Sequence, residues 1–96
     1  MVDGILGTED WIQVAHDSDG GWEWSAISVF YSPSARRYFW YDDAGCSCNW
    51  HMDNVTYVGD FYDGDKKAAI EAAHYWTNVQ TEIRDFDPKK VVDTAE

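Results

Sequence analysis

The stretch that decides the fold runs from residue 22 to residue 31 and reads WEWSAISVFY. Successive side chains of a β-strand point to opposite faces, so Trp24 and Phe30 share one face while Ile27 and Val29 share the other. Both faces of this stretch therefore carry apolar groups. That pattern is typical of a central strand with packing on both sides.

Three further stretches have strand character, because they are rich in β-branched and aromatic residues. The turn formers DSDGG at residues 17–21 and SPSA at residues 32–35 separate the first three strands. The four expected strands cover residues 11–16, 22–31, 36–42 and 55–62. Sequential strands joined by short turns usually pair as neighbours, so we expect an antiparallel meander of three or four strands.

A helix is expected after the strands. Alanine and larger apolar residues recur at helical spacing from Ala69 to Ile83, and Asp65 is a suitable N-cap. We therefore predict one helix over residues 65–83, packed on one face of the sheet.

The chain reads as one domain over residues 1–96, because its length is too short for two ordinary cores. The ordered core is expected at about residues 10–84. Pro88 follows the predicted helix, and we expect part of the tail at residues 85–96 to be flexible. The predicted fold class is α+β, with a sheet of three or four strands and one C-terminal helix.

The charge of the chain disfavours two classes of partner. Eighteen Asp and Glu against seven Lys and Arg give a net charge of −11, which repels nucleic-acid phosphates and anionic lipids. No stretch approaches the roughly 20 apolar residues of a membrane span, and residues 1–7 lack the pattern of a signal peptide. We expect no direct nucleic-acid binding, no membrane association and a cytoplasmic location.

Six Trp, six Tyr and four Phe are more aromatic residues than one helix can cover. The second face of the sheet is covered by the segment around Ile5 and Leu6, the Val91-Val92 tail and the long loop, or it is an exposed interface. An exposed face would bind another protein or a second copy of the chain as a homodimer. The candidate partner-binding residues are those of the third strand: Tyr38, Phe39, Trp40 and Tyr41.

The most unusual local feature is GCSCNWH at residues 45–51. Cys46, Cys48 and His51 could supply three ligands of a tetrahedral zinc ion, although structural zinc sites usually space their cysteines by two to four residues. A disulfide between residues i and i+2 closes a very small ring, so we expect both thiols to be reduced and, without zinc, packed as small buried hydrophobes. The candidates for a fourth ligand are His16, His74, Asp43 and Asp53.

No pattern in the sequence predicts an enzyme. A nucleophilic Cys46 or Cys48 would need a base such as His51, oriented by Asp42 or Asp43, and the spacing does not fix that geometry. The chain has no Gly-rich phosphate loop, no His-Glu-x-x-His and no Gly-x-Ser-x-Gly motif. We therefore expect no catalytic activity.

Three blocks of sequence carry a family resemblance: WSA at residues 24–26, RRYFW at 36–40 and DAGCSC at 43–48. With them, residues 22–52 resemble a group of small uncharacterised proteins from actinobacterial phages. The most specific element is the Tyr-Phe-Trp run that leads into Gly-Cys-Ser-Cys. The resemblance implies a phage accessory protein that works in the bacterial cytoplasm, and it assigns no activity and no site.

The sequence therefore favours a non-enzymatic, acidic binding protein that acts by protein–protein interaction. Two alternatives stay open at this point. One is a structural module stabilised by zinc on Cys46, Cys48 and His51. The other is an acidic mimic of nucleic acid that blocks a basic host protein, which would require carboxylates at phosphate-like spacing on one face.

Overall fold

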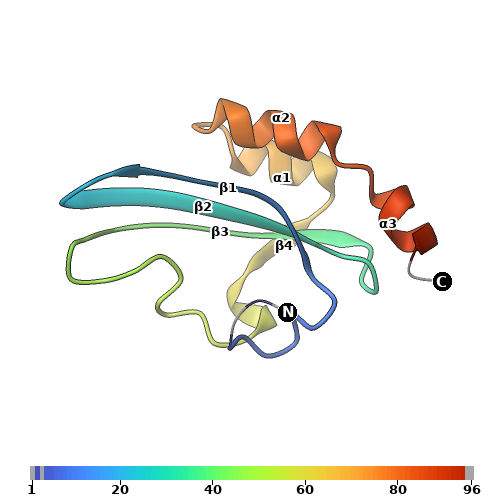
Figure 1. Ribbon diagram of the computed structural model, residues 1–96, viewed down its shortest axis with the longest axis horizontal. Helices are drawn as coiled ribbons and strands as arrows, with labels where there is room; N and C mark the ends of the chain where they lie inside the picture. Colours follow the sequence, from blue (N-terminus) through green and yellow to red (C-terminus); the bar gives the residue numbers. More distant parts are fainter. Residues whose placement is uncertain (1, 3, 95–96) are drawn as a thin grey trace.

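A four-stranded antiparallel sheet forms the middle layer of the molecule (Figure 1). The computed structural model describes residue 2 and residues 4–94. The strands lie in the order β1-β2-β3-β4. Their bounds are β1 Ile12–Gly20, β2 Glu23–Ser32, β3 Arg37–Cys46 and β4 Tyr62–Gly64. The predicted α+β class and antiparallel meander are confirmed.

The first and third strands are longer than predicted at the end of the sheet that holds Gly20, Glu23 and Cys46, which we call the distal end. Residues 17–20, expected as a turn, continue β1 and pair with β2 from Ile27 to Trp24. The chain reverses over residues 21–22 alone, next to Gly20 with a φ of 109°. Pairing with a strongly apolar neighbour strand therefore outweighs the turn preference of residues 17–20.

The fourth strand is shorter than predicted. Of residues 55–62 only Tyr62 is in β4, and a 3₁₀-helix, η1, occupies Val58–Asp60. The carboxylate of Asp60 accepts hydrogen bonds from the backbone N–H of Thr56 at 2.9 Å and from its hydroxyl at 3.3 Å. These bonds satisfy the backbone locally and replace a strand ladder with a tight turn.

The predicted single helix is wrong, because residues 65–83 form two helices. They are α1 at Lys66–Ala72 and α2 at Thr77–Asp85. Asp65 caps α1 as predicted, accepting a hydrogen bond from the N–H of Ala68 at 2.8 Å. The break covers residues 73–76, and three of them, His74, Tyr75 and Trp76, have modest helix propensity. The two helices then lie side by side over the sheet (Figure 1).

The tail is also more ordered than predicted. Residues Pro88–Thr94 form α3, with Pro88 at the first helical position, where its missing N–H costs nothing. The end of the predicted flexible tail, residues 95–96, lies outside the described residues. Among the helices of the described part of the chain, none has the length and apolar content needed to cross a membrane.

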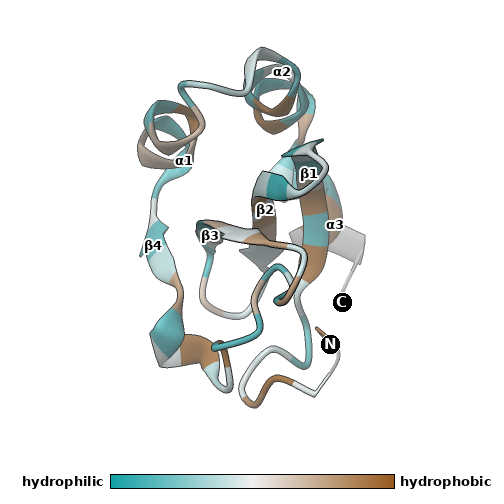
Figure 2. Ribbon diagram, turned by 90° about the vertical axis from the view of Figure 1, so that its left-hand side faces the viewer, coloured by the Kyte–Doolittle hydropathy of each residue, from teal (hydrophilic) through white to brown (hydrophobic). Residues whose placement is uncertain are grey.

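One hydrophobic core lies between the sheet and the two helices. Figure 2 shows α1 and α2 forming a layer above the strands. Ala69 and Ala73 at α1 and Val79 and Ile83 of α2 are buried against this face. The ammonium of Lys66 also donates hydrogen bonds to two backbone carbonyls at the C-terminal end of α2, both at 2.8 Å. The small alanines let α1 approach the sheet closely.

A second core lies on the opposite face of the sheet, which the chain covers itself. Trp11 stacks on Phe39 with ring centroids 4.4 Å apart and meets the edge of Phe61 at 4.8 Å. Ile5 from the N-terminal segment and Val55 from the long loop complete this core. Of the two alternatives from the sequence, the structure contains the covered face, with the N-terminal segment and the long loop as the cover. Leu6 is exposed, and neither Leu6 nor Val91 belongs to this core.

The expected exposed aromatic face on the third strand is wrong. Tyr38 and Trp40 are buried in the helix-side core, Phe39 is buried in the second core, and Tyr41 is half-buried beside it. The physical reason is the long loop and the N-terminal segment, which occupy the face that one helix layer leaves open. These four side chains hold the sheet together rather than form a free surface.

Candidate functional site

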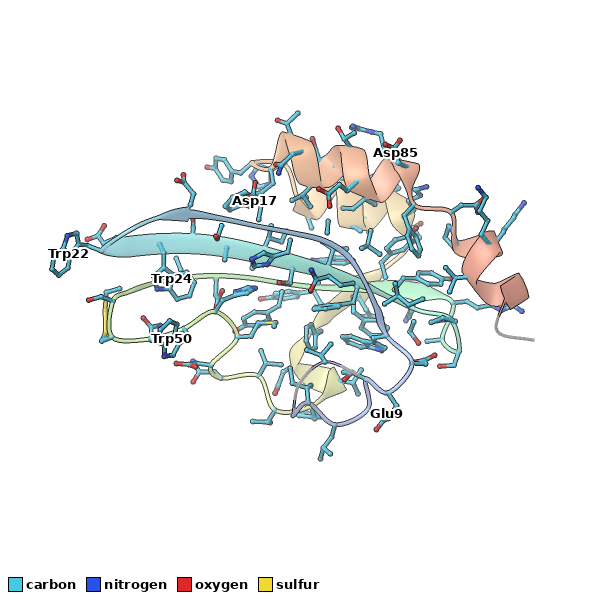
Figure 3. All side chains as sticks on the ribbon, viewed as in Figure 1. Glu9, Asp17, Trp22, Trp24, Trp50 and Asp85 are labelled. Carbon is cyan, nitrogen blue, oxygen red and sulfur yellow. A yellow bond between two sulfur atoms is a disulfide. The ribbon has the colours of Figure 1, made fainter. Side chains whose placement is uncertain are left out.

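The distal end of the sheet projects beyond the helices (Figure 1), and the loop after β3 returns beneath it. Between this loop and the β1–β2 hairpin lies an open cavity of about 440 Å³. Two indole rings, Trp24 and Trp50, line it together with the imidazoles of His16 and His51. Figure 3 shows both indoles on the loop side of the sheet, while Trp22 extends from the hairpin tip.

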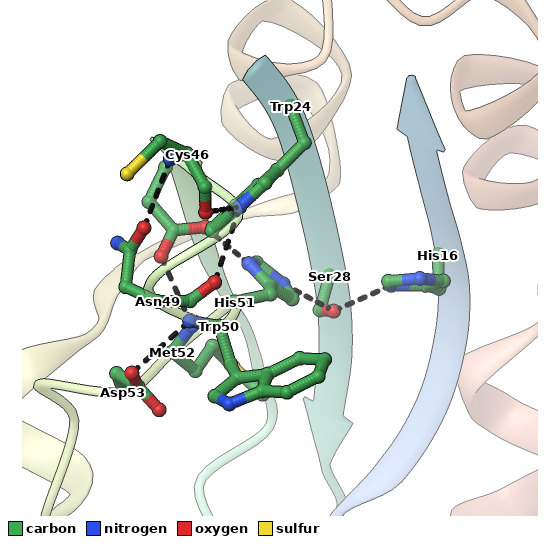
Figure 4. A network of polar contacts seen from close by, with 10 residues as sticks. His16, Trp24, Ser28, Cys46, Asn49, Trp50, His51, Met52 and Asp53 are labelled. Atoms are coloured by element: carbon green, nitrogen blue, oxygen red, sulfur yellow. Dashed lines mark hydrogen bonds and ion pairs between the residues drawn. The ribbon is translucent and has the colours of Figure 1, made fainter. Parts of the chain in front are cut away.

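A chain of hydrogen bonds runs across the sheet behind this cavity (Figure 4). His16 of β1 and Ser28 of β2 are paired in register, and Nδ1 of His16 lies 2.9 Å from the Ser28 hydroxyl. The same hydroxyl lies 2.9 Å from Nε2 of His51, a residue of the loop. Nδ1 of His51 in turn contacts the carboxylate of Asp43 on β3.

The acceptor-only carboxylate fixes the direction of these bonds when both histidines are neutral. Nδ1–H of His51 donates to Asp43, so Nε2 of His51 accepts from the Ser28 hydroxyl. The Ser28 oxygen then accepts from Nδ1–H of His16, which leaves Nε2 of His16 as an acceptor. Apart from Nε2 of His16, every polar atom of this network has a partner of the right kind, so the network orients both imidazoles.

The order Asp43, His51, Ser28 resembles the relay of a serine hydrolase, but its surroundings differ. Ser28 is only 3% exposed. It lies in the middle of β2, between β1 and β3, where backbone groups pair with the neighbouring strands rather than with a developing oxyanion. The geometry is thus suited to holding His51 and its loop in place, not to presenting a nucleophile.

The loop is fixed at its start by Trp24. The indole N–H donates to the carbonyl of Cys46 at 2.9 Å and to that of Asn49 at 3.2 Å. The side chain of Asn49 accepts from the N–H of Cys46 at 2.9 Å. A Cβ at Gly45 would lie only 2.3 Å from the Asn49 amide, so glycine is required for this close contact. These contacts hold one face of Trp24 toward the cavity.

The loop is fixed further along by Asp43, whose second oxygen accepts from the N–H of Met52 at 3.0 Å. The N–H of Trp50 donates to Asp53 at 3.0 Å. The Trp50 side chain itself is 76% exposed at the rim of the cavity. A large indole in solvent on an anchored backbone is available for contact with another molecule.

The expectation of two reduced thiols is wrong, because Cys46 and Cys48 form a disulfide. The turn that Trp24 and Asn49 stabilise brings the two cysteines together at the start of the loop. Both ring nitrogens of His51 are engaged, by Asp43 and by Ser28. The structure therefore does not bring Cys46, Cys48 and His51 together as zinc ligands.

The other candidate ligands do not complete a metal site either. His16 belongs to the hydrogen-bond chain, Asp53 accepts from the loop backbone, and His74 lies at the break between α1 and α2. In the described part of the chain, no group of three or more His, Cys, Asp and Glu is placed to hold a metal ion.

Sequence reasoning found part of this site. It named Asp43 as a residue able to orient His51, and the structure has that contact. It named His16 only as a candidate zinc ligand, and it missed Ser28 and the lining role of Trp24 and Trp50. His16 and Ser28 are register partners and therefore lie on the same face of the sheet. The register of β1 on β2 is thus the information that would have brought them together.

Together, the fold and the site define a small α+β protein with an open aromatic pocket at one end of its sheet. The chain belongs to a family that is described as a domain of unknown function, DUF7574, whose family model matches residues 11–93. No curated protein and no solved structure matches the chain.

Proposed function

We propose that this chain is a non-enzymatic binding protein that acts by protein–protein interaction through the pocket at the distal end of its sheet. The observation that carries the proposal is the exposure of Trp50 and Trp22 beside the pocket, at 76% and 84% of their surface. Tryptophan is enriched in protein interfaces, where its large ring buries much area at little cost in conformational entropy.

The pocket and its rim provide a compact surface for such contacts. The loop backbone is already ordered by Trp24, Asn49 and Asp43, so a partner would not have to order it on binding. The partner in this proposal is a host or phage protein, with a second copy of the chain as the alternative. The resemblance to actinobacteriophage proteins supports an accessory role in a bacterial host.

Affinity capture with matched variants tests the proposal. The chain carrying Trp22→Ala and Trp50→Ala should lose a partner that the natural chain captures from host lysate. Tyr75→Ala is the control, because Tyr75 is 85% exposed and lies at the junction of α1 and α2. We expect this variant to capture the partner as the natural chain does.

Two measurements give the capture experiment a definite outcome. Mass spectrometry identifies the captured protein, and native mass spectrometry of the purified chain distinguishes a second copy from a different partner. Equal capture by all three chains would refute the pocket as the binding surface. A chain that captures nothing at physiological salt and stays monomeric would refute the proposed function.

A further inference from the structure

Charge is distributed unevenly around the pocket. The two segments that build it, residues 16–28 and 43–53, contain no Lys and no Arg. All seven cationic side chains lie elsewhere in the chain, at residues 36–37, 66–67, 84 and 89–90. The pocket segments carry five carboxylates: Asp17, Asp19, Glu23, Asp43 and Asp53. The field at this end of the molecule therefore favours a positively charged ligand.

The lining of the pocket suits a cation in a second, independent way. Trp24 and Trp50 present indole rings, and a cation over an indole face is attracted by the ring quadrupole. The carboxylates of Asp43 and Asp53 lie behind this wall, where they bind His51 and the N–H of Trp50. In the neutral network, Nε2 of His16 is a further acceptor, and His16 lines the pocket itself. Aromatic faces and an acceptor nitrogen together fit a planar cation that both stacks and donates hydrogen bonds.

We propose that this pocket binds an arginine side chain of a partner protein. The guanidinium is planar, stacks on indole rings and donates several hydrogen bonds, whereas lysine has a compact ammonium without a stacking face. The cavity of about 440 Å³ is within the range of ligand pockets and accommodates this group with its aliphatic stem. The inference rests on the proposed function and names the chemistry of the partner.

The indole signals of the protein measure this binding directly. The probe is a short uncharged peptide with one central arginine, compared with the same peptide carrying citrulline, which keeps the shape and loses the charge. We expect the arginine peptide to shift the indole N–H resonances of Trp24 and Trp50. The resonance of Trp22, which does not line the pocket, should stay in place. Citrulline should bind at least tenfold more weakly.

Two variants separate specific binding from general attraction to an acidic protein. Trp50→Ala should weaken the arginine peptide at least tenfold, whereas Tyr75→Ala, at the junction of α1 and α2, should leave its affinity unchanged. His16→Phe removes the acceptor nitrogen of the pocket without changing a residue of either core, and it should also weaken the peptide. It keeps the test decisive if the Trp50 variant folds poorly, which circular dichroism detects.

Three results would overturn the inference: equal binding of the arginine and citrulline peptides, equal shifts at Trp22 and Trp50, or full affinity in both pocket variants. These outcomes can be told apart from failure of the proposed function. If the pocket variants lose the captured partner while the arginine peptide does not bind, the function stands and this ligand is wrong. If the peptide binds but no partner is captured, the pocket chemistry stands and the function is wrong.

Discussion

Among single residues, Tyr38 is buried in the helix-side core with a hydroxyl that lacks a hydrogen-bond partner in the described part of the chain. Burial raises the pKa of Tyr38 to about 12, and the nearby Tyr31 and Asp87 add to this. An unpaired buried hydroxyl costs free energy, because it gives up its hydrogen bonds with water. The aromatic ring, rather than the hydroxyl, is therefore the stabilising part of this side chain.

Tyr38→Phe should leave the free energy of unfolding at pH 7 within about 1 kcal/mol of the natural chain, or raise it slightly. The raised pKa makes the natural chain lose stability as the pH rises above about 10, where the unfolded tyrosine ionises and the folded one does not. The variant lacks this loss. Urea titrations at pH 7, 10 and 11 measure the difference, which should grow with pH in favour of the variant. A loss well above 1 kcal/mol at pH 7 would mean that the hydroxyl has a partner.

Among elements, the long β1–β2 hairpin places the pocket beyond the helices, and its reversal depends on Gly20. This residue has a φ of 109°, and a Cβ there would lie 2.0 Å from the backbone oxygen of Glu23. The neighbouring Gly21 has no atom within 4 Å of such a Cβ. The hairpin geometry therefore requires glycine at position 20 and not at position 21, although the two neighbouring glycines look equivalent in the sequence.

Gly20→Ala should lower the free energy of unfolding by about 1–3 kcal/mol, because it adds backbone strain and a clash with main-chain atoms. Gly21→Ala is the matched control and should change stability by no more than about 0.5 kcal/mol. Chemical denaturation of both variants measures the two values. Equal effects at the two positions would contradict the observed hairpin geometry.

The elements also show what sequence patterns can and cannot predict. The apolar residues on both faces of the stretch 22–31 were enough to predict a central strand. The helical spacing of Ala69, Ala73, Val79 and Ile83 concealed a break, because all four remain buried on the sheet after the chain separates into two helices. Burial patterns report which residues face the core, and they do not report whether the backbone between them is continuous.

The candidate site was harder to predict than the fold, since it combines residues from three strands and a loop. Proximity in sequence was sufficient to suggest that Asp43 orients His51, eight residues away. The pairing of His16 with Ser28 depends on the register of β1 on β2, because a shift of one residue would move the His16 side chain to the other face of the sheet. The register does shift between Gln13 and Ala15, and no local pattern in the sequence indicates this irregularity.

At the scale of the whole molecule, the net charge of −11 on 96 residues opposes compaction. Raising NaCl from about 20 to 300 mM should screen this repulsion and raise the melting temperature. A gain of about 1 kcal/mol corresponds to roughly 4–8 °C for a domain of this size. Calorimetry in the two buffers measures the shift. A fall in melting temperature would mean that attractive ion pairs, such as Arg37 with Asp63, outweigh the repulsion.

The order of the strands has a consequence for how another chain can attach. β1 and β4 form the two edges of the sheet, where unpaired backbone groups would otherwise recruit a further strand. β4 offers only three residues, and β1 carries Asp17 and Asp19 near its distal end together with the irregularity at Gln13. Both edges therefore disfavour the addition of a strand from another chain. A partner is expected to contact the side chains of this protein rather than to pair with its backbone.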